Sequence, residues 1–482
     1  MTTPPVTAPA PPRRVAVVGA GVAGLAAAHR LRVLLGPAAE LTVLEAGDRV
    51  GGVLLTTELA GQPFDVGAEA FLARRPEVPA LLAELGLAGA LVHPSRAVPA
   101  VVAGGRLHPL PRRTLMGVPA DLAALDGLLS DAGARRAGVS RPVAWDPASD
   151  ATVADVVGAA LGAEVVARSV DPLLGGVYSG SAASLGVRAA VPALAAALDR
   201  GAAHEPGGVD LLGAVGATLP ATPVPGPVFG GIAGGYRVLL DGLLAAAAAE
   251  VRLRTAVTGL ERRADGWRLT VTDRGAHRSA LDVDAVVLAV PAPALRRLLT
   301  GPVPAAGAAA GEVEMGSSVV VGLAYAAADV AGVLPGTSGA LVATGEPGHA
   351  KAFTHSSRKW PHLDDGATVL LRASLGRFGD TTALGRDDVE LVGLVRADLA
   401  ALHGLDARPV DAVVARWGGG LPQYAPGHLD RVERLRAAVA AEPGLAVAGA
   451  VLAGVGVPAT VGTARAAAEH LAAGPRPGVS IG

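Results

Sequence analysis

Residues 15–24 read Val-Ala-Val-Val-Gly-Ala-Gly-Val-Ala-Gly, and this stretch decides the fold of the chain. Its first four residues are typical of a short buried strand, and three glycines follow at the spacing Gly-x-Gly-x-x-Gly. Gly19 permits a tight turn, Gly21 lets the backbone approach a pyrophosphate, and Gly24 lets the next helix pack closely on the sheet. We expect that helix over residues 25–35, with its free N–H groups directed at the phosphates. The stretch therefore predicts a dinucleotide-binding turn.

An acidic residue at the end of the next strand completes this unit. Residues 41–44 indicate a second buried strand, and Glu45 follows it, 21 positions after Gly24. A carboxylate at this place accepts hydrogen bonds from ribose hydroxyl groups and repels a 2′-phosphate. NAD and FAD meet these requirements equally well, so this unit alone leaves both cofactors open.

A second pair of glycines lies shortly after the acidic residue. Residues 45–52 read Glu-Ala-Gly-Asp-Arg-Val-Gly-Gly, so Gly51 and Gly52 allow another backbone segment to come close to the same diphosphate. Arg49 adds a positive charge beside them. Residues 64–69 then read Phe-Asp-Val-Gly-Ala-Glu. This continuation favours FAD over NAD.

The composition excludes several classes of function. The chain has 482 residues, no cysteine and a formal net charge of −2. Without cysteine it has no disulfide, thiolate metal ligand, cysteine nucleophile or cysteine-linked flavin, and it contains no metalloprotease or serine-hydrolase motif. The nearly neutral charge offers no field that would gather nucleic acid. We therefore predict no metal site and no nucleic-acid partner, and the length suggests two or three domains.

The run from residue 15 to residue 70 resembles the FAD domain of the superfamily that contains amine oxidases, protoporphyrinogen oxidases and phytoene desaturases. Residues 449–458, followed by a helix expected over residues 463–471, resemble the closing flavin segment of that superfamily, whose last helix points at the flavin ring. Ala459 and the pair Thr463-Ala464 stand where the family often carries Asp and Ser-Gly. The resemblance implies non-covalently bound FAD.

The resemblance also implies an α/β fold. A Rossmann-like FAD-binding domain, discontinuous in the sequence, is expected together with an α+β substrate domain and a helical domain. Stretches rich in Pro and Gly mark the boundaries, and the uncharged run 445–465 contains enough glycine to predict no transmembrane segment. The expected parts are a disordered tail at 1–12, the FAD-binding domain at 13–95, 236–300 and 440–474, the helical domain at 96–214, and the substrate domain at 215–235 and 301–439.

Further segments resemble the porphyrinogen oxidases of the superfamily. The resemblance implies that three rounds of hydride removal from a porphyrinogen pass six electrons to dioxygen and give hydrogen peroxide, in haem biosynthesis. The element Lys359-Trp360-Pro361 resembles those members that act on coproporphyrinogen III, which implies this substrate and coproporphyrin III as the product, with protoporphyrinogen IX as the alternative. An amine oxidase, a carotenoid desaturase or a non-enzymatic flavoprotein on the same fold are the further alternatives. The segments are residues 106–111, 116–119, 171–180, 357–361 and 416–428.

Matching to the family motifs, residue by residue, implies a set of FAD contacts. The glycine turn and the acidic segment would hold the ADP half, a second segment would line the flavin, and a valine would lie on the adenine side. No side chain is implied as a catalytic acid or base, because the flavin carries the chemistry. The residues expected to bind FAD are Gly19, Ala20, Gly21, Val22, Ala23, Gly24, Glu45, Ala46, Arg49, Gly52, Val53, Gly67, Ala68, Glu69, Ala70, Val257, Trp417, Ala450, Val455, Gly456 and Val457.

Arginines are the candidates for binding the substrate, because a porphyrinogen carries several carboxylates and a guanidinium group pairs with a carboxylate through two donors. Arg96 lies in the segment where relatives place a basic substrate contact, and Arg106 and Arg112 are the next candidates. The alternative for each is a solvated surface arginine. The resemblance further suggests that Tyr424 touches the porphyrinogen ring.

The resemblance implies a cytoplasmic location, peripheral contact with the inner face of the cell membrane, and transient contact with a ferrochelatase. In relatives the helical domain can lie on the membrane surface. Leu115, Leu122, Leu125 and Leu129 have nearly helical spacing, which fits either a membrane-facing surface or a packed core. We favour the core interpretation.

Overall fold

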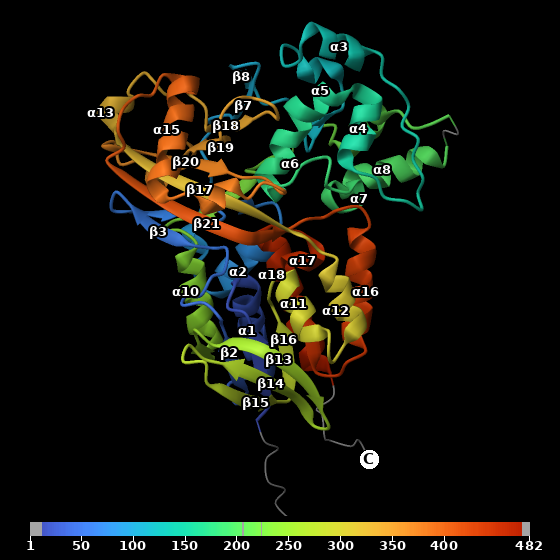
Figure 1. The fold of residues 1–482 in the computed structure, drawn as a ribbon, viewed down its shortest axis with the longest axis vertical. Coiled ribbons are helices and arrows are strands. Elements are labelled where there is room, and N and C mark those ends of the chain that lie inside the picture. The colour runs from blue at the N-terminus through green and yellow to red at the C-terminus, as the bar shows by residue number, and fades with distance from the viewer. Residues whose placement is uncertain (1–11, 205–206, 223, 475–482) are drawn as a thin grey trace, which may run out of the picture.

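The computed structural model describes residues 12–204, 207–222 and 224–474, so the expected tail lies outside the described residues except for Pro12. Figure 1 shows three bodies: an α/β body at the bottom, a large sheet above it, and a group of helices beside that sheet. The helices α17 and α18 lie near the point where the three bodies meet.

A five-stranded parallel sheet forms the centre of the α/β body. Its strand order is β12-β2-β1-β16-β22, and every neighbouring pair is parallel. The strand β1 is buried on both faces, as the apolar run at its centre requires in a parallel sheet covered by helices. The two ends of the chain therefore meet in one sheet. The strands are β1 (Arg14–Val18), β2 (Glu40–Leu44), β12 (Glu250–Arg252), β16 (Ala285–Leu288) and β22 (Leu445–Val447).

Helices and a small antiparallel sheet surround these strands. The helix α1 packs against α18, since buried residues of both, such as Leu25 and Val461, share one hydrophobic cluster. The elements are α1 (Val22–Leu35), α2 (Glu77–Glu84), α10 (Arg237–Ala247), α11 (Ala292–Leu299), α12 (Pro304–Gly311), α16 (His428–Ala440), α17 (Ala450–Ala453), α18 (Val457–Ala473) and the strands β13 (Ala256–Arg263), β14 (Gly266–Thr272) and β15 (Arg278–Val283).

The last helix starts earlier than the sequence indicates. We expected it over residues 463–471, but α18 begins at Val457, immediately after Gly456, whose backbone is extended. Pro458 lies in the first turn, where proline is well tolerated because no helical acceptor is needed for its missing N–H. The prediction treated this proline and the glycines before it as helix breakers. The N-terminus of α18 thus coincides with the residues expected at the flavin.

The large sheet has seven strands in the order β21-β17-β20-β19-β18-β7-β8. The expected antiparallel pairing holds for most of it, but β18 and β7 are parallel. The helix α15 packs on it, because Leu391, Val395 and Leu399 share a cluster with residues of the strands. The elements are β7 (Ala100–Ala103), β8 (Arg106–Pro109), β17 (Met315–Ala326), α13 (Ala327–Val330), β18 (Gly339–Val342), β19 (Ala350–His355), α14 (Ser356–Lys359), β20 (Thr368–Leu375), α15 (Asp388–His403) and β21 (Asp411–Pro422).

Two of the expected domain boundaries are wrong. Residues 100–109, expected in the helical domain, form β7 and β8 of the large sheet, because the buried Ala-Val-Val-Ala run pairs with β18. The helices α12 and α16, expected in the substrate domain, pack in the same hydrophobic cluster as β16. Both errors arise where a short apolar segment pairs with strands or helices far away in the sequence.

The helical body has its own hydrophobic core. Leu125 and Leu128 are buried in it, and Leu115, Leu122 and Leu129 pack against it from its edge. These leucines therefore face a core, although the segment forms two short strands and a 3₁₀ turn rather than a helix. Among the described residues, no helix combines the length and the apolar character needed to cross a bilayer. The elements are β9 (Thr114–Leu115), β10 (Val118–Pro119), the turn Leu122–Leu125, α3 (Asp131–Gly138), α4 (Val153–Leu161), α5 (Ala163–Val165), the π-helical turn Val166–Val170, α6 (Asp171–Tyr178), α7 (Val187–Ala190), α8 (Pro192–Ala202) and α9 (Leu211–Thr218).

A pair of histidines between α15 and the large sheet predicts sensitivity to acid. The rings of His355 and His403 pack edge to face with their centroids 5.6 Å apart. Burial lowers the pKa of His403 to about 4, and it lowers the pKa of His355 as well. Both are neutral in the folded chain at pH 7 but bind protons near pH 6.5 once unfolded, so stability is lost as the pH falls from 6.5 toward 4.

We expect each of these histidines to contribute a slope of at most about 1.4 kcal/mol per pH unit in that window. Urea unfolding at a series of pH values measures this slope. Replacing His403 with Phe keeps an aromatic ring and removes the titration, so the variant should show a flatter dependence between pH 6.5 and 4. An equal slope in the variant would show that His403 does not titrate there.

Candidate functional site

The glycine turn after β1 has the geometry that the motif predicts. Gly19 has a φ of +99°, and a Cβ on it would lie 2.4 Å from the carbonyl oxygen of Ala289. A Cβ on Gly24 would lie 1.8 Å from the carbonyl oxygen of Gly19. The chain itself therefore requires glycine at both positions, one for the turn and the other for the close packing of α1.

Gly21 differs from these two glycines because the chain leaves space around it. Its φ of −68° suits any residue, and the nearest heavy atom to an added Cβ is the Cα of Gly52, 3.9 Å away. Gly21 and Gly51 form a parallel bridge, which brings the two glycine segments together. No side chain caps the first turn of α1. The open space at Gly21, beside an uncapped helix N-terminus, fits a diphosphate.

Glu45 is held against the glycine turn by both carboxylate oxygens. Oε2 accepts a hydrogen bond from the N–H of Ala20 at 2.8 Å, and Oε1 accepts one from the N–H of Gly47 at 2.7 Å. Each oxygen keeps a free lone pair that can accept from a ribose hydroxyl group. Val257, on β13, is buried, and the N–H of Thr255, two residues before it, donates to the carbonyl oxygen of Glu45 at 2.8 Å. The segment that carries Val257 therefore lies beside the end of β2, and its contact with the adenine stays a prediction.

Arg49 shapes the loop that carries the second glycine pair. Its guanidinium group donates to the carbonyl oxygens of Val50 and Leu54 at 3.0 and 3.1 Å, and to that of Gly52 at 2.7 Å. It also lies 5.8 Å from the ring centre of Trp417, on β21. Arg49 is therefore not a solvated surface residue, because its donors are used within the loop, and its contact with FAD stays a prediction.

Trp417 connects the large sheet to the α/β body. Its Nε1 donates to the carbonyl oxygen of Val66 at 2.9 Å. Gly67 passes so close to the loop after the glycine pair that a Cβ would lie 2.0 Å from the carbonyl oxygen of Val53. The structure thus brings together Trp417, Arg49 and the segment that was expected to line the flavin, although they are far apart in the sequence.

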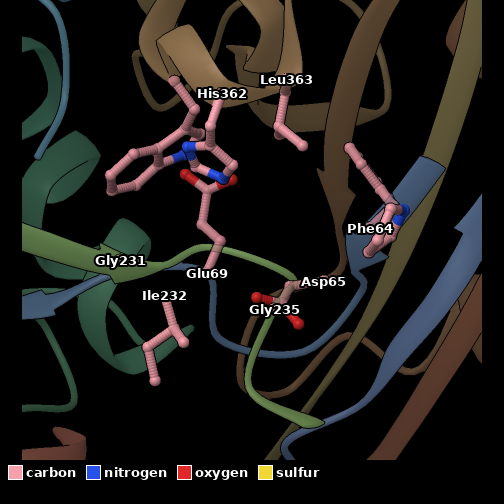
Figure 2. A pocket seen from close by; sticks show the side chains of 10 residues that line it. Phe64, Asp65, Glu69, Gly231, Ile232, Gly235, His362 and Leu363 are labelled. Carbon is pink, nitrogen blue, oxygen red and sulfur yellow. The ribbon is translucent and has the colours of Figure 1, made fainter. Parts of the chain in front are cut away.

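The side chain of Glu69 is turned toward α14 and the turn that follows it. Figure 2 shows it extending toward His362, while Asp65 lies apart from it. Its carboxylate pairs with the Nζ of Lys359, and Nη1 of Arg372 lies 3.8 Å from Oε2. Burial alone would raise the pKa of Glu69, but the charges of Lys359 and Arg372 hold it below its ordinary value. The carboxylate of Glu69 is therefore occupied by this ion pair, and the predicted contact of Glu69 with the flavin would fall to its backbone.

Arg372, on β20, ties this carboxylate to the backbone of the same segment. Its guanidinium group donates to the carbonyl oxygen of Gly67 at 2.5 Å and to that of Asp65 at 3.3 Å. Sequence reasoning missed Arg372, because no motif marks it. It also placed Lys359 in the substrate domain without a partner. The pair formed by Lys359 and Glu69 connects the segment expected to line the flavin to the large-sheet body.

The small cavity in Figure 2 is not a cofactor site. It encloses about 20 Å³ between β4 (Gln62–Asp65), β11 (Phe229–Ile232) and the turn Pro361–Leu363, which is room for about one water molecule. Burial raises the pKa of Asp65 to about 6, although hydrogen bonds from the hydroxyl of Thr56 and the N–H of Tyr236 lower it in part. The carboxylates here support the fold beside the site.

The remaining elements link the two sheets around this cavity. The hairpin of β3 and β4 packs on the large sheet, since Leu59 and Phe64 share a cluster with Val320 and Ala324. The strand β11 pairs with β5 on one side and β6 on the other. The elements not yet given are β3 (Thr56–Leu59), β5 (Phe71–Leu72) and β6 (Leu91–Val92).

The closing segment lies between α17 and the start of α18, where Val455, Gly456 and Val457 were expected to contact the flavin. Tyr424 supports this segment instead of facing a substrate. It is 3% exposed, and its hydroxyl group donates to the carbonyl oxygen of Ala450 and accepts from the N–H of Gly454 at 2.7 Å. The expectation that Tyr424 touches the porphyrinogen ring is therefore not supported by its buried position.

Of the three candidate arginines, Arg96 lies nearest to the Glu69 pair. Arg96 is exposed and forms no hydrogen bond or ion pair with the rest of the described chain. Its neighbour Ser95 donates its N–H to the carbonyl oxygen of Lys359 at 2.8 Å and its hydroxyl to that of Arg358 at 2.7 Å. Arg96 is thus held beside the element that fixes the flavin-lining segment.

The other two arginines lie on or just after β8, the edge strand that pairs with β7. Arg106 pairs with Ala103 at the turn of this hairpin, the end away from the segment that carries Arg96. Arg112 is exposed and lies nearer to that segment, because the N–H of Leu110 donates to the carbonyl oxygen of Pro99 at 3.4 Å. Arg106 is therefore a weaker candidate than Arg96, and Arg112 stays the second candidate.

Comparison with known proteins identifies the family. The family described as flavin containing amine oxidoreductase matches residues 22–472. The coproporphyrinogen III oxidases of Mycobacterium bovis and Mycobacterium tuberculosis are each 48% identical to this chain over 94% of its length and 96% of theirs. The coproporphyrinogen III oxidase of Mycobacterium leprae is 47% identical over 96% of this chain and 98% of its own length.

Solved structures agree with this result. One from Exiguobacterium sp. 255-15, provisionally described as a protoporphyrinogen oxidase, matches with a TM-score of 0.82 and 26% identity over 95% of this chain and 98% of that one. The cyclohexylamine oxidase of Brevibacterium oxydans is 18% identical, with 96% of this chain and 99% of that one covered. Its TM-score is 0.67, and at this identity it shows the fold alone. The chain belongs to the flavin-containing amine oxidoreductase family, as a relative of its coproporphyrinogen III oxidases, and is an FAD-dependent oxidoreductase.

Proposed function

We propose that this enzyme oxidises coproporphyrinogen III to coproporphyrin III in haem biosynthesis, with dioxygen as the acceptor and hydrogen peroxide as the product. The observation that carries the proposal is the 48% identity to the mycobacterial coproporphyrinogen III oxidases, which extends over 94% of this chain and 96% of theirs. Protoporphyrinogen IX is the second candidate substrate. The chloroplastic protoporphyrinogen oxidase of rice supports it more weakly, at 27% identity over 91% of this chain and 84% of the rice protein.

The residues of the site bind and orient rather than transfer protons. FAD, when bound, supplies the hydride acceptor. The glycine turn and Glu45 would hold its ADP half, and the backbone at Gly67 and Glu69 would line its ring. Trp417 and Arg49 close the space between the two sheets beside that segment. The chain's own contribution is to hold the substrate over one face of the ring and to keep water away.

A comparison of the two porphyrinogens tests the proposal. Porphyrin fluorescence should rise rapidly with coproporphyrinogen III and slowly with protoporphyrinogen IX. Oxygen consumption and peroxide should rise in parallel, with three molecules of peroxide for each porphyrin, because each round transfers two electrons. Rapid turnover of protoporphyrinogen IX with none of coproporphyrinogen III would overturn the substrate assignment, and porphyrin formation without peroxide would overturn the acceptor.

Arg96 is the residue that we expect to bind a substrate carboxylate. A forked arginine–carboxylate pair that is partly shielded from water contributes roughly 1–3 kcal/mol. Replacing Arg96 with Ala should therefore lower kcat/KM about ten- to a hundredfold while the flavin content stays normal. Lys at this position should restore only part of the loss, since an ammonium group makes no paired contact.

Arg106 provides the matched control, because it is also an exposed arginine but lies at the turn of the β7–β8 hairpin, the end away from Arg96. Its replacement with Ala should leave kcat/KM unchanged. Unchanged kinetics for the Arg96 variant and reduced kinetics for the Arg106 or Arg112 variant would transfer the assignment to those residues.

We infer further that the reaction takes place in the cytoplasm and that the product passes to a ferrochelatase, because a metal-free porphyrin requires insertion of a metal. Peripheral contact with the inner face of the membrane is part of the same proposal. Flotation with anionic vesicles and co-purification with a ferrochelatase test these two contacts, and protein that stays unbound in both experiments would refute them.

A further inference from the structure

The loop that closes the flavin site is fixed from two sides by hydroxyl groups. The hydroxyl oxygen of Thr463, inside α18, accepts a hydrogen bond from the N–H of Gly449 at 2.9 Å and donates to the carbonyl oxygen of Thr460 at 2.7 Å. Tyr424 approaches the same loop from the other side, from the chain between β21 and α16. The loop between these two hydroxyls contains the single-turn helix α17.

The hydroxyl group of Tyr424 stands in the place of a helical hydrogen bond. In an α-helix the N–H of one residue donates to the carbonyl oxygen four positions earlier, which here would pair Gly454 with Ala450. Instead, Gly454 donates to the Tyr424 hydroxyl at 2.7 Å, and that hydroxyl donates to the carbonyl oxygen of Ala450. The tyrosine thereby holds the last turn of α17 open. Gly454 can take this conformation because it is a glycine with a φ of +120°.

The surroundings of Tyr424 prevent its ring from moving away. The ring stacks on His428 of α16 with the centroids 3.9 Å apart and packs against Tyr178 of α6 at 5.6 Å. The backbone carbonyl oxygen of Tyr424 accepts a hydrogen bond from the N–H of Gly186 at 2.7 Å. The helical body and α16 therefore both set the position of this hydroxyl, and the hydroxyl sets the position of the loop before α18.

We propose that Tyr424 is a positioning residue for the flavin: by standing between Ala450 and Gly454 it fixes where α18 begins. The inference rests on the proposed placement of the flavin ring beside Val455, Gly456 and Val457. Without the hydroxyl, Gly454 can bond directly to Ala450, α17 closes on itself, and the chain from Gly454 to Val457 shifts. FAD would then bind less tightly and in a changed environment.

Replacing Tyr424 with Phe tests this inference. The ring stays and only the two hydrogen bonds are lost, so we expect the Kd for FAD to rise about tenfold, the loss that about one buried hydrogen bond brings. The visible absorption and circular dichroism of the bound flavin and its midpoint potential should change as well. Tyr178→Phe is the matched control, because it removes a hydroxyl from the neighbouring ring whose bond, to Ala190, is long at 3.4 Å. That variant should keep the flavin properties of the wild type.

A wild-type Kd, flavin spectrum and potential in Tyr424→Phe would overturn the inference. If the variant does not fold, hydrogen exchange on the wild-type holoenzyme decides instead. The amide of Gly454 should be protected as a helical amide is, and exchange at the rate of an open loop would overturn the inference. All these readings concern FAD, so a failure of coproporphyrinogen III as substrate would leave them unaffected.

Discussion

Replacing Gly21 with Val should abolish FAD binding while leaving the fold intact. The backbone at Gly21 suits any residue, and the nearest heavy atom to an added Cβ is 3.9 Å away, so the chain itself leaves room for a β-carbon there. The side chain would instead fill the space that a pyrophosphate needs. We expect the affinity for FAD to fall by on the order of a hundredfold or more, which is a loss of about 2.8 kcal/mol or more. Flavin absorbance after reconstitution and a thermal melt of the apoprotein measure the two effects separately.

Gly24 provides the contrasting control for this experiment. A Cβ there would lie 1.8 Å from the carbonyl oxygen of Gly19, so even Ala should unfold the turn. Gly24→Ala should therefore yield little folded protein, whereas Gly21→Val should yield folded, colourless protein. A yellow Gly21→Val protein with wild-type flavin content would show that this glycine serves only the turn.

The second large effect is expected from replacing Glu69 with Ala. The side chains of Glu69 and Lys359 are only 16% and 22% exposed, and Arg372 lies beside them. Removing the carboxylate leaves two mostly buried cations without their partner. We expect the free energy of unfolding to fall by roughly 2–4 kcal/mol, somewhat less than for a fully buried pair because water reaches these groups in part. Chemical unfolding of the holoenzyme measures this loss, with the rise in flavin fluorescence on release of the cofactor as the signal.

Glu84→Ala is the matched control for this change. Glu84 also pairs with an arginine, Arg465, but its side chain is 42% exposed, so its loss should cost at most about 1 kcal/mol. A second variant that also replaces Lys359 with Met should recover part of the Glu69 loss, because one unpaired charge is then absent. Equal, small effects for Glu69 and Glu84 would show that the buried cluster contributes no more than a surface pair.

The sequence predicted the parts of the site that local patterns define. The glycine turn, β1, β2 and Glu45 follow from residues that are close together in the chain, so their geometry could be expected from spacing alone. The pair of Lys359 and Glu69 joins positions 290 residues apart, and the bond of Tyr424 to Ala450 depends on how α17 ends. Neither has a local signal, because each exists only once distant segments have packed.

The same reason explains the errors at element and domain boundaries. The start of α18 depends on a proline that breaks a helix in the middle but fits its first turn. The strands β7 and β8 were assigned to the wrong body because their apolar residues fit a helical core as well as a sheet. For β7 the pairing with β18, rather than the composition of the segment, decided the outcome.

The five-stranded sheet has a consequence for how the enzyme is made. Its outer strand β22 consists of residues 445–447, and α18 covers α1 only after these residues are in place. During synthesis the N-terminal strands emerge long before the strand and helix that complete their sheet. The nascent α/β body therefore stays incomplete until β22 and α18 have left the ribosome, so cofactor loading is a late step of folding.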